Sequence, residues 1–411
     1  MKLTLNKELY YQIIYMICVI IPFFNNYELS FLVWLVASIL TIKNKYSVPF
    51  LKYLSYFIFI FSLAFFVGLF FNYKLYFIIR DITYLLKPIF GLILGYQLFY
   101  DKTKNPFQFI VYAGVAIASY HLFLVVWGIL FEGARNVREI REQGGYFNDF
   151  EVYTLIILLF HKQFQLNFTK QKTRIFIGIL ALSSFFYLAR TNFIQFVILF
   201  MAMKNWLVLN KRSITILTSL LVFSVVGYAA IYNYNPKRNG SGLDEFLYKI
   251  KLIPLEAFAT KINREDWKDF HDHYRSYENI RTIEQLSHNN TFLFGEGMGS
   301  QVDLKQKVYL GDMEMRHISI LHNGYMTVFL KSGIPGLLIL FGSILFFFKK
   351  FHSYSEIDTK INLLFLGTGV FLIFSYWVFM GFYNLIDTKT LLIGYLFAYK
   401  NHIQKTNKSL Q

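Results

Sequence analysis

Charged residues are scarce in this chain of 411 residues, because Asp, Glu, Lys and Arg together make up only 16% of it. A soluble domain usually carries about 25%, so the chain has too few charged groups to cover a surface that faces water. Hydrophobic residues make up 55%, and they form continuous runs rather than the alternating pattern of a β-barrel strand. We therefore predict an all-α fold, a polytopic bundle of transmembrane helices.

Cysteine is almost absent, since Cys18 is the only one, and this excludes a disulfide within the chain and a cysteine-based metal or redox centre. The sequence also contains no phosphate-binding loop of the G-x-x-x-x-G-K-[ST] type and no H-E-x-x-H metal motif. His271-Asp272-His273 has the composition of a metal chelate, but a lone pair of this kind in a polar loop is usually solvated. We expect neither a metal nor another cofactor.

Twelve apolar stretches have the composition of membrane spans. We expect nine of them in residues 1–233, a large hydrophilic loop at 234–318, and three spans and a tail in 319–411. The first stretch follows Lys2 and Lys7 without a small-x-small cleavage site, so we expect it to remain as an uncleaved span. The predicted spans are 10–25, 29–43, 51–71, 77–99, 107–131, 147–161, 174–189, 191–209, 213–233, 319–348, 360–382 and 387–399.

The net charge of +16, from 41 basic and 25 acidic residues, would suggest nucleic acid as the partner of a soluble protein. In a membrane protein it instead fits the rule that lysine and arginine gather in cytoplasmic loops. If the N-terminus is inside, an even number of spans returns the C-terminus to the same side, and most lysines then fall inside. This arrangement predicts that residues 234–318 face outward. We expect the protein to contact membrane lipids and not nucleic acid.

The densest local motif is His322-Asn323, followed after nine residues by Gly333-Ile334-Pro335-Gly336, where the outer loop returns to the membrane. Histidine titrates near neutral pH and can act as a general base, and Asn323 could orient a substrate hydroxyl. The glycines and the proline permit a sharp bend, so the stretch 319–348 is long enough to hold a kinked helix. The alternative is an interfacial histidine that caps a helix.

Arginines on the outer side are the second signal. Arg190 lies between two apolar runs with almost no loop, where its planar fork suits phosphate oxygens. The alternative is a side chain that extends to the interface without binding a ligand. Arg275 and Arg281 lie in the large loop, and Arg135, Arg138 and Arg141 cluster in another outer loop. Surface charge is the ordinary explanation for these, but a basic outer cluster also suits an anionic lipid.

Two further features remain open. Arg80, Asp81 and Lys87 lie within the fourth span, where they form either an intramembrane ion pair or an ion pathway. The run Gly295-Glu296-Gly297-Met298-Gly299 does not follow a predicted strand, so a turn is a better interpretation than a phosphate-binding loop.

The spacing from His322-Asn323 to Gly333-x-x-Gly336 resembles the signature of the O-antigen ligase and O-antigen polymerase superfamily. Three other stretches resemble that family in the same order, so the resemblance covers the chain from about Gly144 to Gly336. These stretches are Gly144-Gly145-Tyr146-Phe147-Asn148-Asp149-Phe150, Ala189-Arg190-Thr191 and Phe294-Gly295-Glu296-Gly297-Met298-Gly299.

The resemblance implies a metal-independent membrane glycosyltransferase at the outer face of a bacterial plasma membrane. Its donor would be a glycan on undecaprenyl pyrophosphate, held by Arg190 and Arg275, with Arg281 or Arg264 as alternatives for the loop position. His322 would activate the acceptor hydroxyl. The acceptor would be another lipid-linked glycan in a polymerase, which we slightly favour, or lipid A–core or another lipid in a ligase. A transporter or flippase is the competing class, and the nearly uncharged spans argue against it.

Overall fold

The computed structural model describes residues 6–24, 26–103, 105–135, 137–145, 148–208, 210–237, 244, 247, 248, 250–252, 262, 270, 273–310, 313–384 and 386–408. Most of them are helical. The helices are α1 (Lys7–Ile20), η1 (Ile21–Phe24), α2 (Tyr27–Leu40), α3 (Val48–Gly68), α4 (Leu75–Leu98), α5 (Gln108–Phe131), α6 (Val137–Gly144), α7 (Asp149–Leu159), α8 (Lys170–Phe186), α9 (Arg190–Met203), α10 (Lys211–Tyr234), α13 (Tyr274–His288), α14 (Gly324–Phe346), α15 (Glu356–Phe379), η2 (Gly381–Tyr383) and α16 (Lys389–Lys408).

Among the described residues, six helical segments are long and apolar enough to cross a membrane, namely Lys7–Phe24, α3, α5, α10, α14 and α15. Each of the twelve predicted spans overlaps a helix. Several of these helices are shorter than a full crossing, which needs about 20 residues: α7 has 11 residues and α9 has 14. The protein is therefore a helical membrane-type bundle, and the count of twelve spans stays a prediction.

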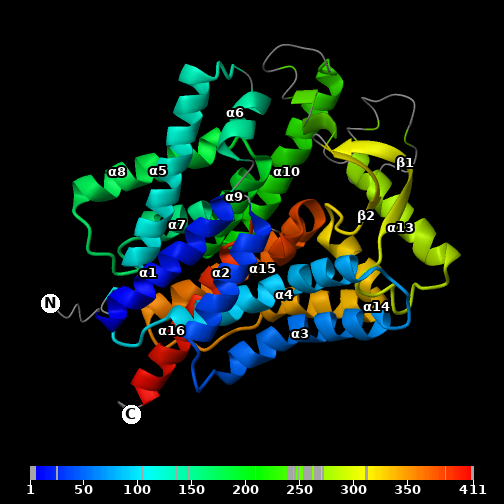
Figure 1. Ribbon diagram of the computed structural model, residues 1–411. Helices are drawn as coiled ribbons and strands as arrows, with labels where there is room; N and C mark the ends of the chain where they lie inside the picture. The colour runs from blue at the N-terminus through cyan, green and yellow to red at the C-terminus, as the bar shows by residue number, and fades with distance from the viewer. Residues whose placement is uncertain are drawn as a thin grey trace.

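Helices far apart in the sequence pack closely in the bundle. Helix α16 packs against α4, α14 against α3, and α15 against α9. Small residues permit the first of these approaches, because a Cβ added at Gly95 would lie 2.0 Å from the carbonyl oxygen of Leu391 and one at Gly394 would lie 2.1 Å from that of Leu92. Figure 1 places both termini at the end of the molecule away from α13 and the two strands.

The hydrophilic segment contains a β-hairpin, which the all-α prediction missed. Strands β1 (Val302–Leu310) and β2 (Met313–Ile318) pair antiparallel, with an irregular register between Asp303 and Val308. Apolar side chains from both strands, Val302, Leu304 and Ile318 among them, pack in one buried cluster with α13. The hairpin and α13 thus form a small layer at one end of the bundle (Figure 1).

Helix α14 is bent, which confirms the predicted kink. Gly333 has φ 60° and ψ −157° inside the helix, a conformation open almost only to glycine. A Cβ at this position would lie 2.2 Å from the carbonyl oxygen of Leu293. The amide of Ile334 instead donates to the carbonyl oxygens of Phe292 (3.3 Å) and Leu293 (3.1 Å). The kink therefore allows the loop residues Phe292 and Leu293 to pack against the middle of α14.

The charged residues of the fourth predicted span do not pair as one group. Arg80 Nε lies 3.9 Å from Asp81 Oδ1, but the close partner of Asp81 is Lys331 of α14, at 2.6 Å, with both side chains 1% exposed. Lys87 donates instead to the backbone carbonyl of Asn384, at 3.0 Å. The ion-pair interpretation thus holds for Asp81, with a partner 250 residues away in the sequence.

The glycine turn at residues 295–299 and the adjacent Ser300 form hydrogen bonds with this ion pair. Gly299 N–H donates to Asp81 Oδ2 at 2.7 Å, and Lys331 Nζ donates to the carbonyl oxygen of Ser300 at 2.5 Å. Gly295 and Gly297 have φ of +73° and +75°, values that favour glycine. A Cβ on Gly297 would lie 2.1 Å from the amide nitrogen of Gly68. These glycines form a packed structural turn between α3 and α14.

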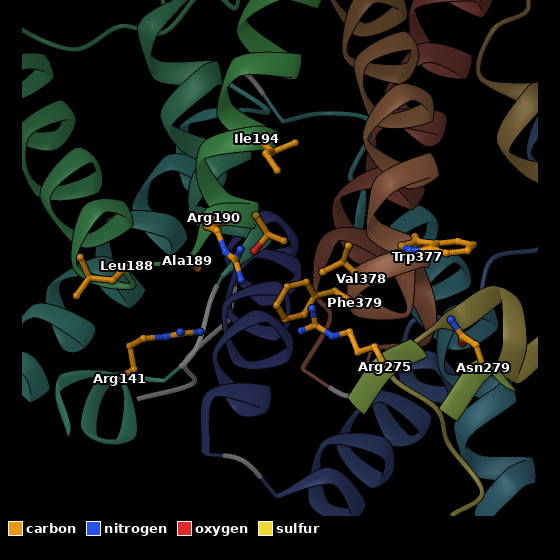
Figure 2. Close-up of a pocket in the computed structure, with 11 residues that line it drawn as sticks. Arg141, Leu188, Ala189, Arg190, Ile194, Arg275, Asn279, Trp377, Val378 and Phe379 are labelled. Carbon is orange, nitrogen blue, oxygen red and sulfur yellow. The ribbon is translucent and has the colours of Figure 1, made fainter. Parts of the chain in front are cut away.

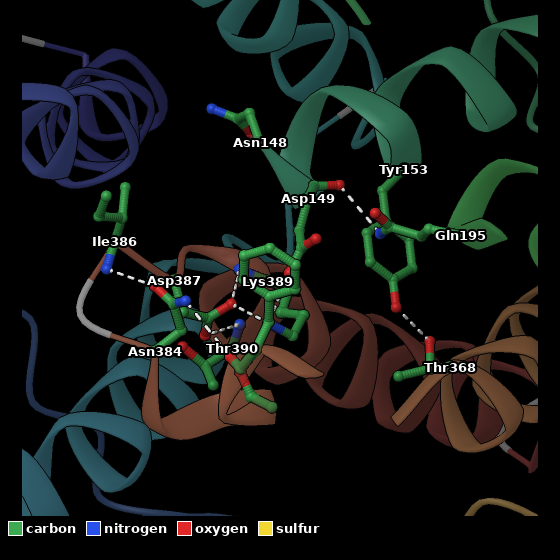
Figure 3. A network of polar contacts seen from close by, with 12 residues as sticks. Asn148, Asp149, Tyr153, Gln195, Thr368, Asn384, Ile386, Asp387, Lys389 and Thr390 are labelled. Atoms are coloured by element: carbon green, nitrogen blue, oxygen red, sulfur yellow. Dashed lines mark hydrogen bonds and ion pairs between the residues drawn. The ribbon is translucent and has the colours of Figure 1, made fainter. Parts of the chain in front are cut away.

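A second buried charge network joins α7 to the segment before α16 (Figure 3). Lys389 Nζ lies 2.6 Å from Asp149 Oδ2 and 2.6 Å from Asp387 Oδ1, and it also donates to the carbonyl oxygen of Gly381 at 2.9 Å. All three charged side chains are at most 6% exposed. Because each buried charge has an opposite partner, the network is a structural tie between distant parts of the chain.

Candidate functional site

A cavity of about 200 Å³ opens among the ends of four helices. It lies where α6, α9, α13 and α15 approach one another, with apolar walls and a basic interior (Figure 2). The lining residues are Arg141 of α6, Leu188 and Ala189 of the turn before α9, Arg190, Thr191 and Ile194 of α9, Arg275 and Asn279 of α13, and Trp377, Val378 and Phe379 of α15.

Three arginines from separate parts of the chain meet at this cavity. In Figure 2 the guanidinium groups of Arg141, Arg190 and Arg275 point into the same space. The guanidinium carbon of Arg275 lies 5.8 Å from the centre of the Phe379 ring, within cation–π range. Planar guanidinium groups bind phosphate oxygens through two parallel hydrogen bonds. The cavity therefore has the charge and donor geometry for a phosphate or pyrophosphate group beside an apolar wall.

The N-terminus of α9 adds to the positive charge of the cavity. Arg190 and Thr191 are the first two residues of α9 and both line the cavity. Ala189 at the cap position provides no side-chain hydrogen bond to the first backbone N–H groups. A helix N-terminus carries a partial positive charge and favours anions, so this backbone reinforces the three arginines.

A buried polar cluster supports the turn that presents Arg190. Tyr187 donates to Glu151 Oε1 at 2.8 Å, and Ser183 donates to Glu151 Oε2 at 2.5 Å. The His121 ring stacks on Tyr187 with centroids 3.7 Å apart and planes 2° from parallel. Leu188 then turns the chain with φ +48°. Since Tyr187 lies three residues before Arg190, the cluster fixes the backbone from which that arginine projects.

His322 lies against a buried carboxylate that sequence reasoning missed. His322 Nδ1 is 2.9 Å from Glu278 Oε1, and the backbone N–H of His322 donates to Glu278 Oε2 at 2.9 Å. Glu278 is 1% exposed, whereas the His322 side chain is 42% exposed. The Tyr274 ring meets the imidazole edge-on at 5.7 Å. Burial, reinforced by Glu278, raises the pKa of the Tyr274 hydroxyl above its ordinary value.

Asn323 is the N-cap of α14. Its Oδ1 accepts from the backbone N–H groups of Tyr325 (2.9 Å) and Met326 (3.3 Å), and the side chain is buried. Asparagine is among the preferred N-cap residues because it satisfies these N–H groups. The capping alternative thus applies to Asn323 rather than to His322, and the contacts of Asn323 Oδ1 are those of a structural residue.

His322 and the arginine cavity share neighbours on two sides. On α13, Glu278 contacts His322, while the next residue, Asn279, lines the cavity. On α15, Phe379 lines the cavity, and a Cβ on Gly324 would lie 2.9 Å from Cα of Met380, the residue after Phe379. The imidazole and the arginine cavity therefore lie near each other, along α13 and at the end of the bundle that carries it.

Arg281 lies outside this site. It follows Arg275 by six residues, which places it about 120° around α13. Its Nε donates to the carbonyl oxygen of Asp303 at 3.3 Å, and it also pairs with Glu284. Arg264, His271 and Asp272 lie outside the described residues. Within the described part of the chain, no group of three metal-binding side chains is close enough to hold an ion.

We compared the chain with models of known protein families, with curated proteins and with solved structures, and none of them matches it.

Proposed function

We propose that the protein is a metal-independent membrane glycosyltransferase that transfers a glycan from undecaprenyl pyrophosphate to a sugar hydroxyl. The observation that supports this most directly is on α13, where Glu278 pairs with His322 while Arg275, three residues earlier, lines a cavity with two other arginines. Glycosyl transfer from a lipid pyrophosphate needs one group that takes a proton and others that stabilise a leaving phosphate. The sequence resemblance to O-antigen ligases and polymerases points to the same chemistry.

The donor would bind with its pyrophosphate among Arg141, Arg190 and Arg275. The apolar wall, with Ile194 and Trp377, offers contact for the first part of a lipid chain. Negative charge on the pyrophosphate increases as the glycosidic bond breaks. Fixed guanidinium groups stabilise that charge more in the transition state than in the bound donor, which is the condition for a faster reaction.

The acceptor would place its hydroxyl at the half-exposed face of His322. The imidazole takes the hydroxyl proton as the acceptor oxygen forms a bond with the anomeric carbon. The bond from that carbon to the pyrophosphate oxygen breaks, and its electron pair leaves with the lipid pyrophosphate. A general base of this kind contributes roughly 10²–10⁴-fold in rate.

The same proposal includes the topology. The helices of the twelve predicted spans would cross the plasma membrane of a bacterium, with the termini in the cytoplasm and residues 234–318 and the site facing outward. Lysine and arginine asymmetry supports this orientation. The position of both termini away from α13 and the hairpin is compatible with it (Figure 1).

A polymerase stays slightly favoured over a ligase, because short, aromatic-rich members of the family that the sequence resembles are often polymerases. The donor site would be common to both enzymes, and only the acceptor would differ. A transporter or flippase is the other class. The bundle holds more charges than the sequence suggested, yet Lys331 and Lys389 each lie 2.6 Å from a buried carboxylate. Paired charges such as these two are typical of structural contacts rather than of an ion pathway, which favours the enzyme.

The proposal can be tested with purified protein in lipid nanodiscs and a purified lipid-linked glycan. We expect a new glycosidic bond and one released undecaprenyl pyrophosphate for each bond formed, with no loss of rate in EDTA. Movement of the donor between leaflets of a proteoliposome without bond formation would support a flippase instead.

Deletion of the gene, followed by glycan analysis, separates the two acceptors. Accumulation of lipid-linked polymer indicates a ligase. Single repeat units on the final acceptor indicate a polymerase.

A further inference from the structure

We propose that Glu278 is a positioning residue for His322, and that it fixes the imidazole in the form whose Nε2 accepts a proton. This inference rests on the proposed function, because it assigns a role to a residue that acts only through the proposed base. Glu278 touches neither the cavity nor the half-exposed side of the ring.

The contacts of Glu278 specify one orientation of the ring. Its two carboxylate oxygens accept from two different groups of His322, the backbone N–H and ring Nδ1, both at 2.9 Å. A carboxylate can only accept hydrogen bonds, so Nδ1 must carry the proton in the neutral imidazole. Nε2 is then the nitrogen with a free electron pair. The Nδ1 hydrogen bond opposes a flip of the ring, and the backbone hydrogen bond fixes the main chain from which the ring projects.

The surroundings make this arrangement rigid. Glu278 is 1% exposed and lies in the second turn of α13, whose buried face packs on the hairpin through Tyr277. The Tyr274 ring lies edge-on to the imidazole. On the other side, Asn323 caps α14 directly after His322. Preorganisation by a buried carboxylate and a packed ring is how a general base is held ready for its substrate.

Placement on α13 also links the base to the donor site. Arg275 and Asn279 are three residues before and one residue after Glu278, and both line the arginine cavity. The two hydrogen bonds that Glu278 accepts from His322 therefore set the distance between the acceptor base and the pyrophosphate-binding helix. Transfer requires the base His322 and the pyrophosphate-binding arginines near one anomeric carbon. The carboxylate of Glu278 would therefore both orient the imidazole and set its distance from Arg275.

Glu278→Gln tests the proposal. The glutamine carbonyl can still accept from the His322 backbone, but its amide donates to Nδ1 and favours the opposite tautomer, with the proton on Nε2. We expect kcat for transfer to fall about 10²–10⁴-fold, while KM for the lipid-linked donor stays within about threefold. Glu278→Asp keeps a carboxylate and should retain more activity than Glu278→Gln.

Glu296→Gln is the matched control. Glu296 is also a buried carboxylate, and it ties α13 to the glycine turn by accepting from Gln285 and Asn289, both at 2.7 Å. It contacts neither His322 nor the arginine cavity. This substitution should lower thermal stability to a similar degree as Glu278→Gln without the loss in kcat.

A double-mutant cycle with His322→Ala separates the outcomes. If Glu278 acts only through His322, Glu278→Gln should cause no further loss in the His322→Ala background. Equal losses in both backgrounds, or an aspartate variant no more active than glutamine, would overturn the positioning role. Full activity of Glu278→Gln beside an inactive His322→Ala would also reject it and leave the proposed function intact. An active His322→Ala protein would reject the proposed function itself.

Discussion

Arg190→Lys separates charge from geometry at the donor site. The substitution keeps a positive charge at the N-terminus of α9 but replaces a planar fork with a single ammonium group. If Arg190 binds the pyrophosphate, at least one of two parallel hydrogen bonds is lost. If Arg190 only extends to the membrane interface, lysine does so equally well and the change is nearly silent.

The size of the effect follows from the site. A hydrogen bond to a charged group contributes about 1.5–3 kcal/mol, which corresponds to a loss of about 10- to 150-fold in kcat/KM. Arg190 is exposed, and Arg141 and Arg275 remain in the cavity. Solvent screening and the two remaining guanidinium groups reduce the loss, so we expect the lower part of this range.

The assay is transfer from purified lipid-linked glycan by wild-type and variant protein at matched expression and folding. Arg275→Ala should impair transfer at least as strongly as Arg190→Lys. Arg281→Ala is the matched control, because Arg281 lies on the same helix but binds Asp303 and Glu284 outside the cavity. A fully active Arg190→Lys protein would refute the donor role of Arg190, and equal losses for Arg275→Ala and Arg281→Ala would refute the assignment of the cavity.

Three further predictions concern the fold. Asp81→Ala leaves Lys331 buried without its carboxylate, so thermal unfolding in detergent should show a loss of about 3–5 kcal/mol in stability. The second change Lys331→Met should restore that stability. An unchanged melting curve for Asp81→Ala would contradict the ion pair. Gly297→Ala should prevent folding, since a Cβ there meets Gly68 at 2.1 Å, and a normal yield of monodisperse protein would count against the turn. Lys305→Cys should react with an impermeant thiol reagent in intact spheroplasts and Lys350→Cys only after lysis, and the reverse pattern would invert the topology.

Local sequence signals predicted much of the bundle. Each of the twelve apolar runs overlaps a helix, because a continuous apolar stretch in a membrane satisfies its backbone only as a helix. The kink at Gly333 was also readable, from two glycines and a proline within one span. The hairpin was missed because its strands lie in a polar segment and their register is irregular between Asp303 and Val308. The apolar residues Val302, Leu304 and Val308 therefore give only a weak strand pattern.

Pairings across long sequence distances could not be predicted. Lys87 is only six residues from Asp81 and was the nearer lysine, yet Lys331 is the partner because α14 and α4 meet through the glycine turn. Glu278 is 44 residues from His322 and carries no local signature. The cap role of Asn323, in contrast, was predictable from the sequence, because an asparagine directly before a helix is an ordinary N-cap signal.

The central claim is that His322, beside the arginine cavity, takes the proton of the acceptor hydroxyl. Its most direct test is single-turnover transfer from purified undecaprenyl-pyrophosphate-linked glycan by wild-type and His322→Ala protein, with donor binding measured in parallel. We predict that the alanine variant folds and binds the donor as the wild type does, while the rate of glycosidic bond formation falls about 10²–10⁴-fold. A rate near that of the wild type, with donor binding intact, would contradict the account.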